Sequence, residues 1–397
     1  MLNIEEPFKG KYAFLQLGFR PFFSAAIVFS ALGILAWMLV YFTGWALPAD
    51  NYVSVSWHAH EMVFGYTLAV VSGFLLTAIK NWTGVQTLRG KPLLILFLFW
   101  LVARILPFVL DQSSLFILAT VDLLFNFLLA LAITQPILKV RQWQNVAFPV
   151  IGSLIFLSNL VFYLGLLGIW TDGIHYGIYS GFYILLALIF IMGRRVIPFF
   201  IEKGVDESFQ AKNWQWLDVS SLLLLAVFII SDLINPASMI TAVFAGLLFV
   251  LHAMRLYGWY TRGIWSKNLV WILYVGYAWI VFGFLLKVLS ITHGISTFLA
   301  IHSFAYGGIG MITIGMMARV ALGHTGRNVF DPPRILKTSF IFMLIGTVVR
   351  VIFPLINMEN YALWIGIAQV FWILAFTIVL TVYLPMLIKP RVDGQPG

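Results

Sequence analysis

The chain has 397 residues, of which 61% are hydrophobic and only 10% are charged. A soluble globular domain carries roughly 25% charged residues, so this composition excludes that class and indicates an all-α, polytopic integral membrane protein. The chain has no cysteine, which excludes disulfide bonds, zinc sites built from thiolates and iron–sulfur clusters. Any metal must therefore be held by histidine, methionine, carboxylate or backbone oxygen.

Twelve runs of about twenty apolar residues are long enough to cross a membrane as helices. In chain order they cover residues 20–46, 57–80, 91–110, 114–138, 146–169, 174–199, 215–234, 236–260, 268–290, 295–323, 335–357 and 360–388. The loops between them are short, so we expect one integral domain over residues 1–397 that contacts membrane lipid.

The basic residues predict how the chain is oriented. Apart from those at the helix ends that adjoin the loops after even-numbered spans, only Arg104, Lys287 and Arg350 of the 24 lysines and arginines lie within spans. The others lie in the N-terminal arm, the loops after even-numbered spans, the adjoining helix ends or the C-terminal tail, and none lies in a loop after an odd-numbered span. Since basic loops stay in the cytoplasm, both termini are predicted to be cytoplasmic. The net charge of +9 thus reflects membrane orientation, and we expect no nucleic-acid partner.

Two spans carry histidines near their outer ends and resemble each other. Counted from His60 and from His302, both segments have an aromatic residue at +4, glycine at +5 and +13, and Thr-Gly at +23 and +24. This match predicts an internal repeat in which the second and tenth spans run parallel. Histidine inside a bilayer is costly unless it is hydrogen-bonded, paired or bound to metal, so His58, His60 and His302 are candidate ligands.

Arg104 and Arg350 fall near the outer ends of the third and eleventh spans, and each is followed by a proline. An arginine at this depth needs an anionic or carbonyl partner. One hypothesis is that the two arginines hold the propionates of a haem, because a guanidinium matches a carboxylate. The alternative is that they extend to the outer interface and anchor the helix ends.

His58 and His60 are two residues apart, so in a regular α-helix they point about 200° from each other and serve different partners. Glu61 shares a face with His58, which predicts a hydrogen-bonded pair or a metal site made by these two residues. The tenth span also presents a row of glycines, either as a wall for a flat macrocycle or as ordinary helix packing. These are Gly307, Gly308, Gly310 and Gly315.

A second polar layer is expected on the cytoplasmic side, and it includes His252, Arg255 and His324. Membrane anchoring explains most of this layer. His324 lies 22 residues after His302, which is about 33 Å along a helix, so the two cannot share a metal. His252 and His324 are therefore candidates for a separate centre.

Five stretches together resemble the NnrS family, and the resemblance covers nearly the whole chain. They are Leu17–Phe23, Trp57–Met62, Gly193–Phe200, His252–Trp259 and His302–Arg327. The resemblance implies a bacterial cytoplasmic (inner) membrane protein that contains haem and copper. It also implies a role in tolerance of nitric oxide during denitrification or nitrosative stress.

The chain is more weakly similar to the catalytic subunit of haem–copper oxidases, which holds a low-spin haem between histidines near the outer ends of its second and tenth helices. That similarity favours His58 as the ligand, whereas the internal repeat favours His60. Oxidases build their copper site on helices six and seven, where this chain has only His175. Oxygen reduction by the oxidase mechanism is therefore not expected.

These observations predict b-type haem between the second and tenth spans, ligated by His302 and by His58 or His60, with Arg104 and Arg350 at its propionates. Copper is expected as a second cofactor. Its candidate ligands are His58, His60, Glu61, His252, His302 and His324. The protein would handle nitric oxide or iron-nitrosyl species by electron transfer or nitrosyl binding, set by axial ligation rather than by a protein acid or base.

Two alternatives use the same residues differently. A secondary transporter would use the buried charges as a path for substrate and protons. A sensor or assembly factor would bind the cofactor without turnover.

The charge pattern makes a prediction about topology. Reporter fusions after Asp50, Asp172 and Glu359 should be periplasmic, and fusions after Gln86, Lys203 and Arg391 should be cytoplasmic, because the loops after odd-numbered spans lack basic residues. Alkaline phosphatase and fluorescent-protein fusions measure the two locations. A reversed pair of neighbouring fusions would change the number of spans and break the parallel arrangement of the second and tenth.

Overall fold

The computed structural model describes residues 13–205 and 208–395, and every regular element within these ranges is helical. Twelve helices or helix runs are long and apolar enough to cross a membrane. In chain order they are α1 (Phe19–Thr43), α2 to α3 (Ser54–Thr83), α4 and η3 (Lys91–Phe108), η4 and α5 (Gln112–Lys139), η5 and α6 (Trp143–Leu166), α7 (Gly173–Gly204), α8 (Gln215–Ile234), α9 (Met239–Trp259), α10 (Asn268–Thr292), α11 to α12 (Thr297–His324), α13 and α14 (Leu336–Ile356) and α15 (Tyr361–Ile388). The all-α class and the number of spans are confirmed, and most limits differ from the sequence prediction by only a few residues.

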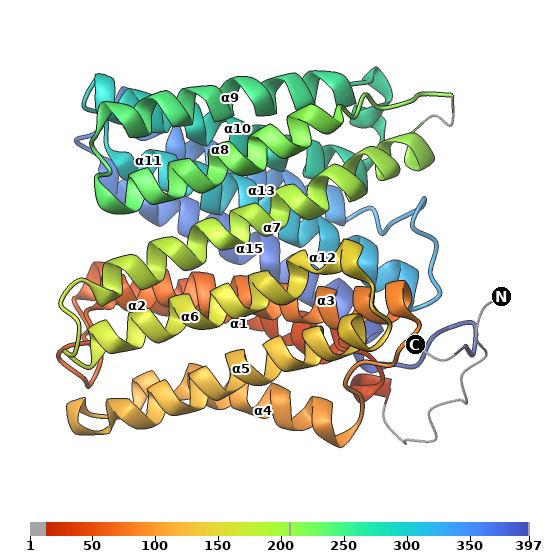
Figure 1. Ribbon diagram of the computed structural model, residues 1–397, viewed down its shortest axis with the longest axis horizontal. Coiled ribbons are helices and arrows are strands. Elements are labelled where there is room, and N and C mark those ends of the chain that lie inside the picture. Colours follow the sequence, from red (N-terminus) through yellow and green to blue (C-terminus); the bar gives the residue numbers. More distant parts are fainter. Residues whose placement is uncertain (1–12, 206–207, 396–397) are drawn as a thin grey trace. The chain divides into compact units, whose positions relative to one another are not determined.

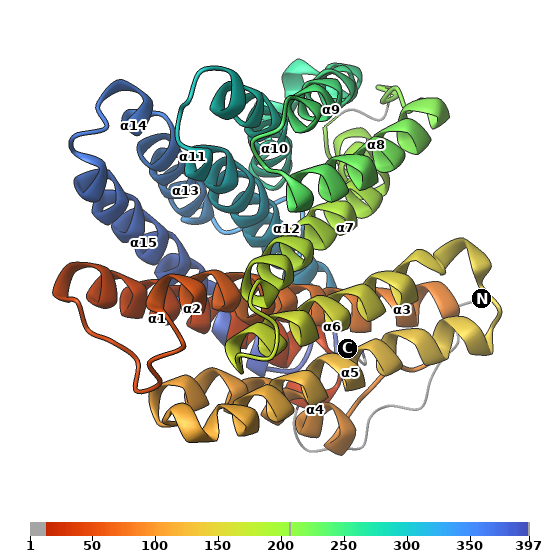
Figure 2. The same cartoon turned by 60° about the vertical axis from the view of Figure 1, so that its left-hand side comes forward.

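The chain divides into two compact units. Unit 1 comprises Met1–Leu185, Val320–Asn328 and Val379–Gly397, and unit 2 comprises Leu186–Arg319 and Val329–Ile378. Within unit 1, α4, α5 and α6 run side by side (Figure 1). Within unit 2, α8, α9 and α10 do the same (Figure 2). The expectation of a single integral domain stays a prediction.

The two histidine spans share an unusual backbone. In the second span, α2 (Ser54–His60) ends at the histidine and a π-helical segment, η2 (Glu61–Thr67), follows it. In the tenth span, α11 (Thr297–His302) also ends at the histidine and the π-helical segment η7 (Ser303–Gly310) follows. A π-helical turn holds one residue more than an α-turn and is frequent at functional sites. The sequence repeat is therefore also a repeat of backbone conformation.

The shared glycines at +13 and +24 of the repeat have structural explanations. A methyl group built on Gly73 would lie 2.7 Å from Phe23, and one built on Gly315 would lie 2.7 Å from Ile272. Only glycine allows the neighbouring helix to pack this closely. The glycines of the two Thr-Gly pairs, Gly84 and Gly326, adopt positive φ angles of 68° and 76° just after α3 (Leu68–Thr83) and α12 (Met311–His324). Glycine commonly ends helices in this left-handed conformation.

Arg20 in α1 stabilises the end of α15. Its side chain is fully buried, and Nη1 donates hydrogen bonds to the carbonyl oxygens of Leu387, at 2.8 Å, and Lys389, at 2.7 Å. The last carbonyls of a helix have no partner within the helix, and a cation there interacts favourably with the helix dipole. A single arginine thus joins the first and last spans within unit 1.

Replacement of this arginine should destabilise the protein. Arg20→Gln should lower the free energy of unfolding by about 3 kcal/mol, because it removes hydrogen bonds from a charged group and leaves buried carbonyls unpaired. Thermal unfolding of the purified protein in detergent measures the change. The control is Lys139→Gln, which removes an exposed cation from the end of α5 (Leu115–Lys139). Equal melting temperatures for the two variants would contradict the role given to Arg20.

Candidate functional site

The second span of unit 1 places His60 and Glu61 in a fully buried network of charges. Arg104, from α4 (Lys91–Ile105), donates from Nη1 to Glu61 Oε2 at 2.7 Å and from Nη2 to Asp122 Oδ1. The Glu61 oxygen Oε1 lies 3.0 Å from His60 Nδ1. None of these four side chains is more than 3% exposed. Glu61, Asp122, His60 and Arg104 therefore form one group of ionisable residues without access to bulk water.

Asn159 and Tyr163 of α6 (Ala147–Leu166) complete this network and determine the direction of its hydrogen bonds. Tyr163 Oη and Asn159 Nδ2 donate to Asp122 Oδ2 at 3.0 and 2.9 Å. Because a carboxylate only accepts, the amide nitrogen of Asn159 must face Asp122, so its carbonyl oxygen faces His60. That oxygen lies 2.9 Å from His60 Nε2.

Both ring nitrogens of His60 therefore face acceptors, and both must donate for the network to be satisfied. A histidine that donates from both nitrogens is the cationic imidazolium. The network then contains two carboxylates and two cations, so its net charge is zero. This balance matters because an uncompensated charge is very costly in a dry interior.

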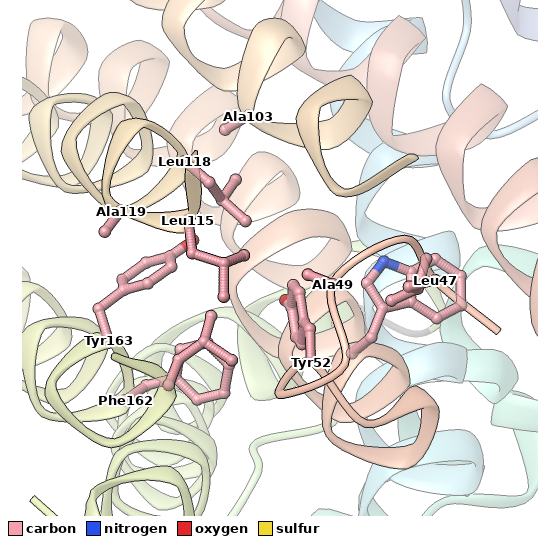
Figure 3. Packing of buried hydrophobic residues seen from close by; sticks show 11 residues of the cluster. Leu47, Ala49, Tyr52, Ala103, Leu115, Leu118, Ala119, Phe162 and Tyr163 are labelled. Carbon is pink, nitrogen blue, oxygen red and sulfur yellow. The ribbon is translucent and has the colours of Figure 1, made fainter. Parts of the chain in front are cut away.

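An apolar cluster of unit 1 covers the network. Its members are Leu47, Ala49, Tyr52, Trp57, Ala103, Leu115, Leu118, Ala119, Phe162, Tyr163 and Leu166. Figure 3 shows the side chains of Tyr52, Leu115 and Phe162 gathered together. The Phe162 ring also stacks on His60, with the ring centres 4.2 Å apart. Exclusion of water strengthens the attraction between the charges beneath this cluster.

This geometry shows what three of the predicted site residues contact. The carboxylate of Glu61 contacts Arg104 and His60 instead of His58, its predicted partner. Both ring nitrogens of His60 face oxygen atoms, and its role as a metal ligand stays a prediction. Arg104 pairs with Glu61 and Asp122, and its role at a propionate also stays a prediction.

His58 has different surroundings from His60. Its ring stacks on Trp37 of α1, with the ring centres 4.6 Å apart and the planes at 7°. The side chain is half-buried rather than sealed. His58 thus keeps its predicted role as a candidate ligand of unit 1.

His302 in unit 2 is held by one backbone carbonyl and one arginine. Its Nδ1 lies 2.8 Å from the carbonyl oxygen of Phe298, one helical turn earlier. A carbonyl only accepts, so Nδ1 carries the proton and Nε2 is the acceptor nitrogen. Arg350 Nη2 lies 3.2 Å from Nε2 and donates to Tyr361 Oη at 3.1 Å. Of the two histidines of the repeat, His302 is the one with an acceptor nitrogen.

The glycines that follow His302 serve helix packing. A methyl group on Gly307 would meet Trp279 at 2.6 Å, one on Gly308 would meet Ile280 at 2.3 Å, and one on Gly310 would meet Trp372 at 2.7 Å. Side chains of α10 and α15 therefore already occupy the space beside these glycines. The structure favours close helix packing over a wall for a macrocycle.

The two histidines of the expected cytoplasmic layer lie in separate units. In unit 2, His252 is fully buried, its Nδ1 lies 2.6 Å from Tyr277 Oη, and its ring stacks on Phe190. In unit 1, the His324 ring lies 5.5 Å from that of Phe19. Each histidine has aromatic neighbours, as expected for packed residues.

Several partners were not predicted from the sequence. Asn159 and Tyr163 lie in a largely apolar span. The only feature of the sequence that could have identified them is the presence of a polar side chain within that span. Asp232 lies within α8, 3% exposed, with its Oδ1 2.6 Å from Lys287 Nζ. Asp218 of the same helix pairs with both Arg194 and Arg255, at 2.6 and 2.9 Å.

Comparison with known protein families gives a match over most of the sequence. The family model described as NnrS protein matches residues 13–391, nearly the whole chain. No curated protein matches the chain.

The unit 1 network predicts non-additive effects of mutation. Arg104→Gln should lower the free energy of unfolding by about 3–5 kcal/mol, because it leaves two carboxylates buried near each other. Adding Asp122→Asn should recover part of this loss, because the double variant removes one charge of each sign. Thermal unfolding in detergent measures both effects.

The matched control is Lys91→Gln, an exposed cation at the start of the same helix. It should leave the melting temperature unchanged. A double variant whose loss equals the sum of the two single losses would show that the charges do not stabilise one another.

Proposed function

The chain belongs to the NnrS family, which makes it a nitric-oxide-related membrane protein, and we propose that it binds b-type haem through His302. We further propose that it handles nitric oxide or iron-nitrosyl species in the bacterial inner membrane. The state of His302 carries this proposal: its Nδ1 proton is held by Phe298, which leaves Nε2 as the acceptor nitrogen.

The surroundings of His302 fit a haem ligand. Histidines that bind metals usually donate their other ring N–H to a carbonyl or carboxylate, which fixes the tautomer and the ring orientation. Phe298 supplies such a carbonyl from the same helix. His302 is half-buried, whereas His60 is fully buried, and the Nε2 of His302 lies 3.2 Å from Arg350 Nη2. A bound haem would supply an iron atom that binds a diatomic gas and carries an electron.

Arg350 and Tyr361 would tune this site. Arg350 is 7% exposed, and its guanidinium carbon lies 5.1 Å from the centre of the Tyr361 ring. Tyr361 also accepts a hydrogen bond from it, so the guanidinium is oriented from two sides. A positive charge fixed beside His302 suits a propionate and favours the reduced state of a nearby iron. We therefore assign the propionate role to Arg350.

Copper has weaker support than haem. Among residues 13–205 and 208–395, no group of three or more His, Cys, Asp or Glu side chains is placed so that it could hold a metal ion. His58 and His252 each offer single imidazoles with aromatic neighbours. Copper binding stays a prediction, and no step of the proposed function depends on it.

One observation favours a second function, transport. Unit 2 holds the buried pair of Lys287 and Asp232, and unit 1 holds the neutral network around His60. Paired charges at membrane depth are typical of substrate and proton paths in transporters. Purified protein without a haem absorbance band would favour this function. Haem without turnover of nitric oxide would favour a sensor or assembly factor.

The haem proposal predicts the effect of one substitution. Purified His302→Ala should lose or shift most of the Soret absorbance, because the ligand is removed while Phe298 and Arg350 remain. Spectra, together with haem content by pyridine haemochrome, measure the change. The control is His293→Ala, an exposed histidine just before the same span, and it should keep the wild-type spectrum.

A second variant separates ligation from general disturbance. Arg350→Gln should keep haem but lower its reduction potential, because it removes a positive charge that disfavours the oxidised iron. A folded His302→Ala protein with full haem content and a wild-type spectrum would show that another residue is the ligand.

A further inference from the structure

Unit 2 contains a cavity of about 220 Å³ at the end where the even-numbered spans finish. It lies where the start of α10, the end of α7, residue Arg319 of α12 and the segment after α12 meet. Its lining comprises Gly204, Ser266, Lys267, Asn268, Leu269, Val270, Arg319, Val329, Phe330, Asp331, Pro332 and Arg334. None of these residues belongs to the His302 site.

Arg319 forms one wall of this cavity. It is only 9% exposed, and its guanidinium carbon lies 3.6 Å from the centre of the Phe200 ring. Within the part of the chain that the structure describes, Arg319 makes no hydrogen bond or ion pair. Phe200 covers one face of the guanidinium, so its N–H groups are left to the cavity.

Membrane anchoring does not explain this placement. An arginine that anchors a helix end extends its head into water, whereas Arg319 is only 9% exposed and lines the cavity. A buried guanidinium without an acceptor is costly. An anion in the cavity would supply the missing acceptor.

The first turn of α10 offers further donors to the same cavity. Its N-cap residue is Lys267, and no side chain caps the helix. Among the described residues, the amides of Asn268 and Leu269 therefore have no acceptor, as expected for the first turn of a helix. The Asn268 side-chain oxygen accepts from Trp271 instead. The positive end of the helix dipole adds to this preference for an anion.

The charges of the lining also favour an anion. Lys267, Arg319 and Arg334 contribute three positive charges and Asp331 contributes one negative charge, which leaves a net charge of +2. Hydrogen-bond donors line the cavity on the first turn of α10, on α12 and on the segment after α12. Several directions of approach suit a group with several oxygen atoms better than a single carboxylate. Apolar residues, including Val270 and the exposed Phe330, lie beside the donors.

We propose that this cavity binds a phosphate group. Two sources offer the same chemistry, the headgroup of an anionic lipid and free inorganic phosphate. Basic pockets between spans on the cytoplasmic side are known to bind anionic headgroups, and the apolar rim fits the glycerol part of a lipid. Neither source involves His302, so the site is independent of haem binding.

The test compares variants of the full chain purified in detergent. Phosphatidylglycerol and phosphatidylcholine are added separately and bound lipid is counted by native mass spectrometry, while inorganic phosphate is titrated by calorimetry. Arg319→Gln should weaken binding roughly tenfold or more, because a charge-assisted hydrogen bond is lost. Arg334→Gln alters an exposed residue of the lining, so it tests the site with little risk to folding. Arg262→Gln, an exposed cation outside the lining, is the control.

The outcomes distinguish the two sources. A preference for phosphatidylglycerol that both lining variants lose and the control keeps identifies a lipid headgroup. Phosphate binding with the same dependence, and no preference between the lipids, identifies free phosphate. If wild-type protein binds neither ligand, or if both lining variants bind as wild type does, the proposal is overturned. Haem content does not enter any of these measurements.

Discussion

A charge buried deep inside a span needs a partner from the protein, because lipid offers none. The arrangement of helices in unit 1 follows from this constraint. Arg104 from the third span reaches Glu61 on the second and Asp122 on the fourth, and Asn159 on the fifth links Asp122 to His60. Four spans are therefore held at one relative height and rotation by hydrogen bonds that cannot be exchanged for water. Apolar packing alone would let these helices slide, since lipid tails are as apolar as leucine.

The two units share one arrangement of a histidine and an arginine, but the polar groups that contact these residues differ. Each has a histidine at the start of a π-helical segment and an arginine on a neighbouring span. In unit 1 carboxylates pair with the arginine, and both nitrogens of His60 face oxygen atoms. In unit 2 the tyrosine Tyr361 replaces the carboxylates and a backbone carbonyl takes one nitrogen of His302. The same plan thus yields a closed, neutral network in one unit and a histidine with an acceptor nitrogen in the other.

The sequence was sufficient for the fold but only partly for the site. Apolar length and the position of basic residues identified twelve spans, because membrane thickness limits helix length directly. The repeat around His60 and His302 was also visible, since it depends on residue identity and spacing. The partners of those histidines were not, because contacts between helices depend on rotation and height. Asn159 lies 99 residues from His60 in the chain. The pairing of His58 with Glu61 assumed a regular α-helix, and η2 begins at Glu61.

The π-helical segments explain why the histidines lie where they do. A wider turn loosens the regular hydrogen bonding of the backbone, so its carbonyls become available to side chains. In η2, Trp100 Nε1 donates to the Gly65 carbonyl at 3.0 Å, and Thr67 Oγ1 donates to that of Met62 at 2.7 Å. The extra residue of the turn also rotates everything that follows it. The residues after each histidine can then pack as an ordinary membrane helix, while the histidine itself faces the polar groups of its unit. Such a turn lets one span serve both a polar site and an apolar bundle.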